Sequence, residues 1–82
     1  MRYKDDNAAE RKAFTKKLGL RIARLRGEQG LSKDELSITA QMHPQLIYDI
    51  EVAKKNASIY LVAKLARGLN VTLSELLEDI NL

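Results

Sequence analysis

The chain is short, with 82 residues, of which 45% are hydrophobic and 30% charged, and it carries a formal net charge of +3. A chain of this length makes one small domain, which buries only about 60–65% of its unfolded surface and is marginally stable alone, so that dimerisation would help it. The lack of cysteine excludes disulfides and thiolate metal sites. No apolar run approaches the roughly 20 residues of a membrane span, and residues 1–10 are unlike a signal peptide, so we expect a cytoplasmic protein with no membrane partner.

Apolar residues recur at helical spacing along the chain, and no segment alternates apolar and polar residues as a strand does. We therefore expect an all-α fold of five helices. The first helix is predicted to start after Asn7 and to stop near Gly27 or Gly30, so that residues 1–7 form a flexible tail and residues 8–82 a single domain. Its buried stripe is predicted from apolar residues three or four apart: Phe14, Leu18, Ile22 and Leu25.

The second helix has a clear start signal. Ser32 and Glu35 have the spacing of a capping box, in which the hydroxyl accepts from one first-turn N–H group and the carboxylate accepts from another. A helix is therefore predicted from Lys33, followed by a tight turn at residues 41–42. Its predicted buried side holds Leu36 and Ala40.

The third helix is predicted to start at Pro44, because the first helical position does not need the N–H group that proline lacks. Ile47 and Ile50 then lie three residues apart and face inward. The outward face is predicted to carry four residues: Gln45, Leu46, Tyr48 and Asp49. Two short helices joined by a tight turn are the outline of a helix-turn-helix.

Two more helices complete the prediction. The fourth is expected to be capped by Ser58 and to end at Asn70, which tolerates a left-handed backbone. Its expected buried residues are Ile59, Val62, Leu65, Ala66 and Leu69. Thr72 and Glu75 form a second capping box, which opens a fifth helix carrying Leu73, Leu76, Leu77 and Ile80. Because these apolar residues exceed what one small core can cover, we predict a dimer interface at Leu77, Ile80 and Leu82.

At these positions the chain resembles the Cro and repressor type of helix-turn-helix proteins, the xenobiotic-response-element family, over roughly residues 18–77. The resemblance rests on residues in the family's order and spacing: Ile22-Ala23-Arg24-Leu25-Arg26, Gly30-Leu31-Ser32, Glu35-Leu36, Ile47, Ile50-Glu51, Ser58, Ala66, Leu69 and Val71 to Leu76. His43 and the run 54–58 are also similar to restriction-modification controller proteins. The resemblance implies a compact lambda-repressor-like DNA-binding domain, whose homodimer sets two third helices into successive major grooves of a roughly palindromic operator. Double-stranded DNA would be its partner, with no cofactor, metal or catalytic residue.

The resemblance also implies site residues by position. Ser32 and Lys33, at the start of the second helix, would contact a phosphate, where N–H groups and the helix dipole favour an anion. The outer, base-reading surface of the third helix comprises His43, Pro44, Gln45, Leu46, Tyr48 and Asp49. The loop before the fourth helix would touch backbone phosphate through Lys54, Lys55 and Asn56. Arg26 and Glu51 match an internal ion pair of the family.

Three residues of the base-reading surface depart from the family pattern. Pro44 stands where controllers carry an arginine, which removes a donor for guanine, and Leu46 replaces a polar or aromatic residue. Asp49 can accept only from a cytosine amino group and is otherwise repelled by phosphates. Residues 27–51 hold one basic and five acidic side chains, a net charge of −4. These features favour an alternative function, a protein-interaction module with the same fold, such as an antirepressor or a dimerisation partner, that has lost operator reading.

Several residues keep more than one interpretation, and for Lys54 and Lys55 the alternative to phosphate contact is a solvated loop. Gln45 has the paired donor and acceptor that read an adenine edge, but an exposed glutamine can equally be solvated. Leu46 could touch a thymine methyl, contact a partner protein or be an ordinary surface residue. His43 makes either a local contact at the helix start or a contact with DNA. Gly19, inside the first helix, either permits a close helix contact or weakens that helix by about 1 kcal/mol.

Attraction to phosphate has to come from basic side chains outside the acidic middle of the chain: Arg11, Lys12, Lys16, Lys17, Arg21, Arg24, Lys54 and Lys55. Only some of those on the first helix can face DNA together, and the alternative is a solvated outer face. An enzyme is not indicated, because the sequence has no glycine-rich phosphate loop and no set of histidine, carboxylate and nucleophile at motif spacing.

Overall fold

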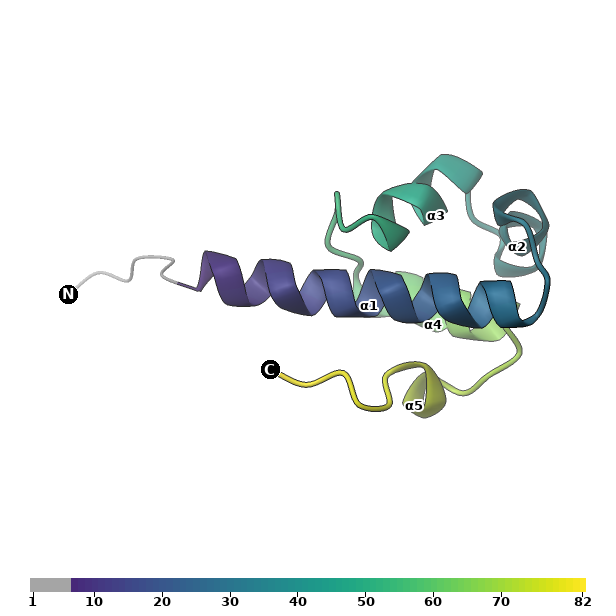
Figure 1. Ribbon diagram of the computed structural model, residues 1–82. Coiled ribbons are helices and arrows are strands. Elements are labelled where there is room, and N and C mark those ends of the chain that lie inside the picture. The colour runs from purple at the N-terminus through teal and green to yellow at the C-terminus, as the bar shows by residue number, and fades with distance from the viewer. Residues whose placement is uncertain (1–6) are drawn as a thin grey trace.

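The computed structural model describes residues 7–82, and within this range the chain forms five helices and no strand. They are α1 (Ala8–Glu28), α2 (Lys33–Ala40), α3 (Pro44–Glu51), α4 (Ile59–Gly68) and α5 (Leu73–Leu76) (Figure 1). The predicted all-α class and the predicted starts of all five helices are confirmed. The predicted flexible tail lies outside the described residues, except for Asn7, which precedes the first turn of α1.

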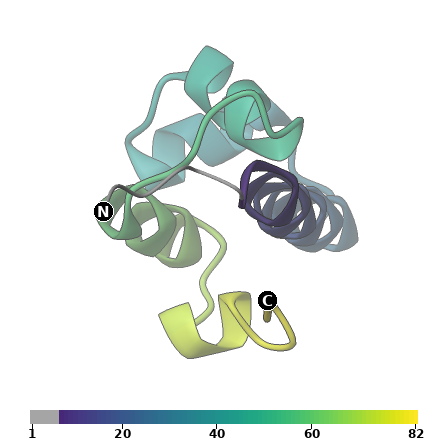
Figure 2. The same cartoon turned by 90° about the vertical axis from the view of Figure 1, so that its left-hand side faces the viewer.

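The long helix α1 is the axis around which the other helices are arranged. Figure 1 shows α2 and α3 along one side of it and α5 along the other, while its first turns project beyond the helix-turn-helix. In the view along α1, α4 lies beside it, between the layer of α2 and α3 and the layer of α5 (Figure 2). This arrangement leaves α3 at the outer surface, where it is accessible to a partner.

One hydrophobic core joins all five helices. Its fully buried large side chains come from every helix: Ile22, Leu36, Ile47, Ile50, Leu65, Leu69 and Leu76. Met42, which we assigned only to the turn after α2, is 7% exposed and belongs to this core. Ile59 is wrong as a core residue, because it begins the first turn of α4 and remains largely exposed.

Serine and threonine caps fix the starts of α2 and α5, as predicted. The Glu35 amide donates to Ser32 Oγ at 3.0 Å, while the Ser32 amide donates to Glu35 Oε1 at 2.8 Å. Thr72 and Glu75 repeat both bonds at the same two distances. Between α2 and α3, Gln41 adopts the left-handed conformation with φ 54°, which ends α2 and reverses the chain.

Gly19 allows α1 and α3 to approach closely. A Cβ atom at this position would lie 2.6 Å from the carbonyl oxygen of Ile50 and would overlap that of Glu51. Side chains essentially never come so close to backbone, so only glycine fits without a shift of either helix. Of the two interpretations of Gly19, the structure therefore supports the close helix contact.

The last helix is shorter than predicted. It ends at Leu76, so Leu77 and Ile80 lie in the turns that follow it rather than on the helix. The chain leaves the helix there, since the Glu78 amide donates to the Glu75 carbonyl at 3.3 Å in a turn and Asp79 adopts the left-handed conformation with φ 64°. Arg21 of α1 also caps this end, because its Nη2 donates to the Glu75 carbonyl at 2.9 Å and its Nε donates to the Leu76 carbonyl at 3.4 Å.

Candidate nucleic-acid interface

The start of α3 is organised by a histidine cap. His43 Nδ1 accepts a hydrogen bond from the Gln45 amide at 3.1 Å, and Pro44 takes the first helical position. His43 itself is exposed. Of its two interpretations, the local contact is present in the structure.

The outer surface of α3 is smaller than the sequence predicts. Gln45 is exposed and Tyr48 is 41% exposed. Leu46 is half-buried and packs against the hydrophobic core, and Pro44 is also half-buried. The surface available to a partner therefore centres on Gln45 and Tyr48, with the exposed edges of Pro44 and Leu46 beside them.

Asp49 does not lie on the exposed surface, and our expectation that it would is wrong. It is only 9% exposed. Its Oδ1 accepts from Gln45 Nε2 at 3.1 Å, and its Oδ2 lies 3.8 Å from Lys55 Nζ. Its backbone carbonyl accepts from the Lys54 amide at 2.8 Å, so the loop after α3 folds back over this residue. The carboxylate therefore has partners within the protein and holds a residue of α3 and a residue of the loop together.

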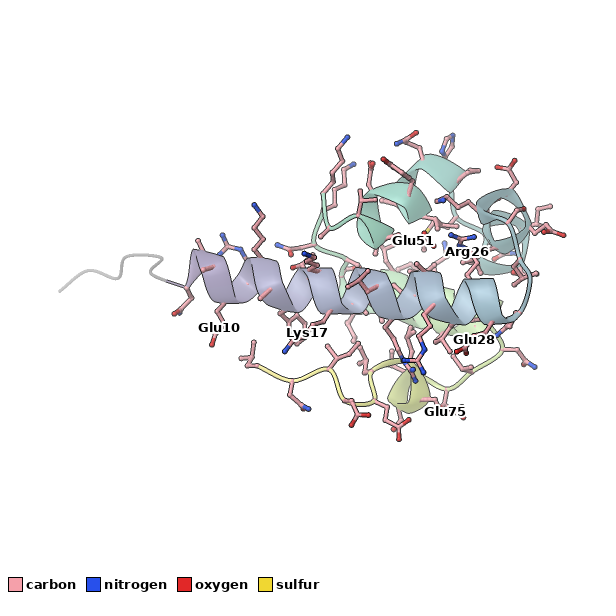
Figure 3. The ribbon with its side chains drawn as sticks, in the orientation of Figure 1. Glu10, Lys17, Arg26, Glu28, Glu51 and Glu75 are labelled. Atoms are coloured by element: carbon pink, nitrogen blue, oxygen red, sulfur yellow. The ribbon has the colours of Figure 1, made fainter. Side chains whose placement is uncertain are left out.

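An ion pair between Arg26 and Glu51 ties the end of α1 to the end of α3, as the resemblance implies. Arg26 Nε and Nη2 donate to the two carboxylate oxygens at 2.7 and 3.0 Å, and Figure 3 shows the two side chains pointing toward each other. Their side chains are 17% and 5% exposed. Arg26 Nη1 also donates to the Leu31 carbonyl at 2.9 Å, so the pair fixes the loop before α2. The hydrogen bond to Glu51 raises the pKa of Arg26 above its usual value, which keeps the guanidinium charged.

Lys33 lies in the space between α2 and α3. Its Nζ is 3.9 Å from Glu51 Oε1 and 5.7 Å from the centre of the Tyr48 ring. A cation over an aromatic face is attracted by the ring's electrons. This contact places a positive charge next to the exposed side of α3, while Ser32 takes part in the capping box just before it.

The first turn of α2 is a weaker anion site than the resemblance implies. Asp34 and Glu35 both lie in this turn. The hydrogen bond from the Ser32 amide, followed by the effect of the Ser32 side chain, lowers the pKa of the Glu35 carboxyl group and so favours its charged form. Two negative charges oppose the attraction of the helix dipole for phosphate. Lys33 is the group in this turn that favours a phosphate.

The loop between α3 and α4 is anchored to α1. Thr15 Oγ1 donates to Asn56 Oδ1 at 2.8 Å, while Lys54 and Lys55 are exposed. Asn56 therefore positions the loop, and the two lysines are the groups that can reach a phosphate. Thr15 is a residue that we did not predict to be part of this site. A signal for its burial was present, because it lies three and seven residues before the buried Leu18 and Ile22 and so shares their face of α1.

Several basic residues of α1 are turned away from α3. Arg21 caps α5, and Lys17 Nζ donates to the Asn81 carbonyl at 3.2 Å. Arg24 pairs with Glu28 at 3.2 Å. These three residues therefore contact the C-terminal segment or their own helix instead of the surface around α3.

Other kinds of site receive no support from the described residues. In residues 7–82 no group of three or more histidine and carboxylate side chains could hold a metal ion. None of the helices in the same range is long and apolar enough to cross a membrane.

Comparisons with known proteins agree on the type of fold. Residues 20–76 match the family model described as helix-turn-helix. The solved structure of the restriction-modification controller protein C.AhdI from Aeromonas hydrophila is 30% identical, with a TM-score of 0.75, and the match covers 78% of this chain and 97% of that chain. The clp gene regulator ClgR from C. glutamicum is 22% identical, with a TM-score of 0.73, over 78% of this chain and 83% of that chain. No curated protein sequence matches.

Proposed function

This chain belongs to the helix-turn-helix family of the xenobiotic-response-element type, and on that basis we propose that it is a cytoplasmic homodimeric regulator that recognises a roughly palindromic operator. The family and the similar regulators make it a DNA-binding transcriptional regulator and not an enzyme. Double-stranded DNA is therefore its partner. The homodimer, the operator symmetry and the residues that read the bases are parts of the proposal.

The observation that carries the proposal is the exposed side of α3, which is flanked by cations from two other segments. Gln45 and Tyr48 lie on this side, Lys33 reaches it from α2, and Lys55 reaches it from the following loop, where the neighbouring Lys54 is also exposed. A helix presented between two positive groups suits the major groove, because backbone contacts orient the helix while its side chains meet base edges.

Gln45 is the residue that we propose reads a base. Its amide group has two N–H donors and one oxygen acceptor, and only one donor is used by Asp49. The second donor and the oxygen remain for the N7 and N6 positions of an adenine, the pairing that glutamine makes in the major groove. The bond to Asp49 fixes the direction of this amide, so Asp49 acts by positioning Gln45.

Three further residues are proposed to contact bases because of their position in the family. His43 and Pro44 begin α3, and the exposed edge of Leu46 can contact a thymine methyl. Phosphate contacts come from Lys33, Lys54 and Lys55, with the Ser32 end of α2 beside them. Asn56 contributes by holding the loop in place.

The dimer is proposed to form through the segment after α5. Leu77 and Ile80 are half-buried against the core, and Leu82 is 83% exposed. Ile80 also borders a hollow of about 270 Å³ together with Leu20, an exposed leucine of α1. A second copy that covers these apolar residues would bring two α3 helices into one assembly.

Selection from a library of random duplexes tests the proposal. We expect the enriched sequences to contain two inverted half-sites about one helical turn, roughly 10 base pairs, apart. Enrichment of single half-sites would contradict the homodimer. A library that stays random after repeated rounds would contradict operator reading.

A second candidate is the protein-interaction module, and one feature of α2 favours it. Its exposed side carries Asp34 and Glu35 together with Ile38, which is 76% exposed. An exposed apolar residue beside carboxylates suits a basic protein partner better than DNA. This candidate predicts that the protein elutes from DNA-cellulose at low salt and that its retention is the same whatever the sequence of the DNA.

A further inference from the structure

We propose that the first half of α1 extends the DNA-binding surface, with Arg11 and Lys12 joining Lys54 and Lys55 in a notch that binds a backbone phosphate. This inference rests on the proposed function, because it assigns a further contact to the same DNA partner. Arg11 and Lys12 lie outside residues 20–76, the part of the chain that matches the family model.

The notch is a concave site of about 300 Å³ between α1 and the loop that joins α3 to α4. Arg11 and Lys12 line it from α1, and Lys54 and Lys55 line it from the loop. Figures 1 and 2 both show this loop passing close to α1 on the side of α3. Four cationic side chains from two segments therefore surround one space large enough for a phosphate group.

The notch is held in shape by residues within the protein. Thr15, which also lines it, donates to Asn56 Oδ1 at 2.8 Å, and this bond fixes the loop against α1. Ala53 has φ 62°, the left-handed conformation that turns the chain into the loop. The two walls are therefore fixed relative to each other before any ligand binds.

The notch is continuous with the surface of α3. Lys55 lines the notch and also lies 3.8 Å from Asp49 of α3. The Lys54 amide donates to the carbonyl of the same aspartate. A phosphate in the notch would therefore belong to the duplex that α3 contacts.

Charge explains why this site suits a polyanion. Four cationic side chains line one space, of which Lys55 also lies near Asp49, and a phosphate group in that space would be attracted to all four. DNA already carries condensed cations, so each contact with a lysine or arginine releases a cation into solution and makes binding depend on salt. The notch should therefore appear as part of the salt dependence of DNA binding.

The test compares two double variants that remove the same charge from different sides of α1. Arg11→Gln with Lys12→Gln removes two charges from the notch. Lys17→Gln with Arg24→Gln is the matched control, because these residues contact the Asn81 carbonyl and Glu28 instead. All four residues are exposed, so both variants should fold, which far-ultraviolet circular dichroism verifies.

Binding to the selected duplex is then measured by fluorescence anisotropy over a salt series for the wild type and both variants. We expect the slope of log K against log salt to be smaller in magnitude by about one to two in the notch variant, because each phosphate contact contributes about 0.9 to the slope. The control variant should have the slope of the wild type. Equal decreases in both variants, or none in either while the wild type keeps its steep slope, would overturn the notch and leave the proposed function standing. A wild type without salt-dependent binding would overturn both.

Discussion

The Gln45 amide donates to the Asp49 carboxylate across one turn of α3 at 3.1 Å, and the same carboxylate lies 3.8 Å from Lys55. The residue that we propose reads a base and one that we propose contacts a phosphate are therefore connected through one buried acid. On an exposed surface this carboxylate would oppose binding to DNA. Buried between its two partners, it instead holds them in fixed positions.

This connection predicts a double-mutant cycle. Gln45→Ala should weaken binding to the selected duplex by about 1–3 kcal/mol and change binding to a scrambled duplex little. Asp49→Ala should lose part of the same preference, and the double variant should lose no more than Gln45→Ala alone, because Asp49 acts through Gln45. Asp34→Ala, which removes an exposed carboxylate from α2, is the control. Additive losses in the double variant would show that Asp49 acts independently.

Two glycines of α1 should respond in opposite ways to alanine. At Gly19 a methyl group overlaps the backbone of α3, so Gly19→Ala should destabilise the protein by about 1–3 kcal/mol. At Gly27 no atom lies within 4 Å of the added carbon, so Gly27→Ala should stabilise the helix by about 0.5–1 kcal/mol. Urea unfolding of the two variants measures both values. A stabilising Gly19→Ala would contradict the close contact between α1 and α3.

Removing one partner of the ion pair between Arg26 and Glu51 should destabilise the protein more than replacing both partners with apolar residues. Glu51→Ala leaves Arg26 charged and half-buried, and should cost about 3–5 kcal/mol of unfolding free energy. Replacing both groups, as in Arg26→Met with Glu51→Leu, should recover most of that loss, because no buried charge is then left unpaired; Lys33, which also contacts Glu51, has a side chain that is 38% exposed. Thermal unfolding of the three proteins provides the comparison. A double variant as unstable as Glu51→Ala would show that the hydrogen bond to the Leu31 carbonyl matters more than the charge pair.

The capping box of α2 predicts a dependence on pH. Hydrogen bonds from the Ser32 amide and hydroxyl hold the pKa of Glu35 below its usual 4.5 in the folded protein. The contribution of this carboxylate to the free energy of unfolding is therefore fully present above pH 4.5, the pKa of Glu35 in the unfolded chain. It is lost as the pH falls through the lower pKa of Glu35 in the folded protein. Glu35→Gln should be less stable than the wild type at neutral pH, and the difference should vanish in acid. A difference that stays constant down to acid pH would contradict this linkage.

The segment after α5 predicts the oligomeric state. Ile80→Glu places a charge on the proposed dimer interface, and sedimentation should then give the mass of one chain instead of two. Ile38→Glu, on the exposed side of α2, is the control and should leave the mass unchanged. If Ile80→Glu retains twice the monomer mass, the dimer forms elsewhere.

Local signals made most of the fold predictable from the sequence. The capping boxes at Ser32 and Thr72 and the proline at position 44 act within one helical turn, so they determine helix starts without help from the rest of the chain. The ion pair between Arg26 and Glu51 could be predicted from the resemblance to a family. These features located the helix-turn-helix and its exposed helix correctly.

The errors came from contacts between segments distant in the chain. The last carbonyls of α5 accept from Arg21, which lies 54 residues before Glu75 and is brought to it by packing. Asp49 is buried because the following loop folds back and brings Lys55 over it, and hydrophobic periodicity carries no information about that loop. The notch likewise needs α1 and the loop to meet, which Thr15 and Asn56 achieve across 41 residues.

Sequence-specific binding of DNA is the central claim, and it is tested most directly by fluorescence anisotropy with the selected duplex and a scrambled duplex of equal length over a salt series. We expect a steep decrease of affinity with salt on both duplexes and a preference of about a thousandfold or more for the selected one. Equal, weak binding to the two duplexes would contradict operator reading and would favour the protein-interaction module.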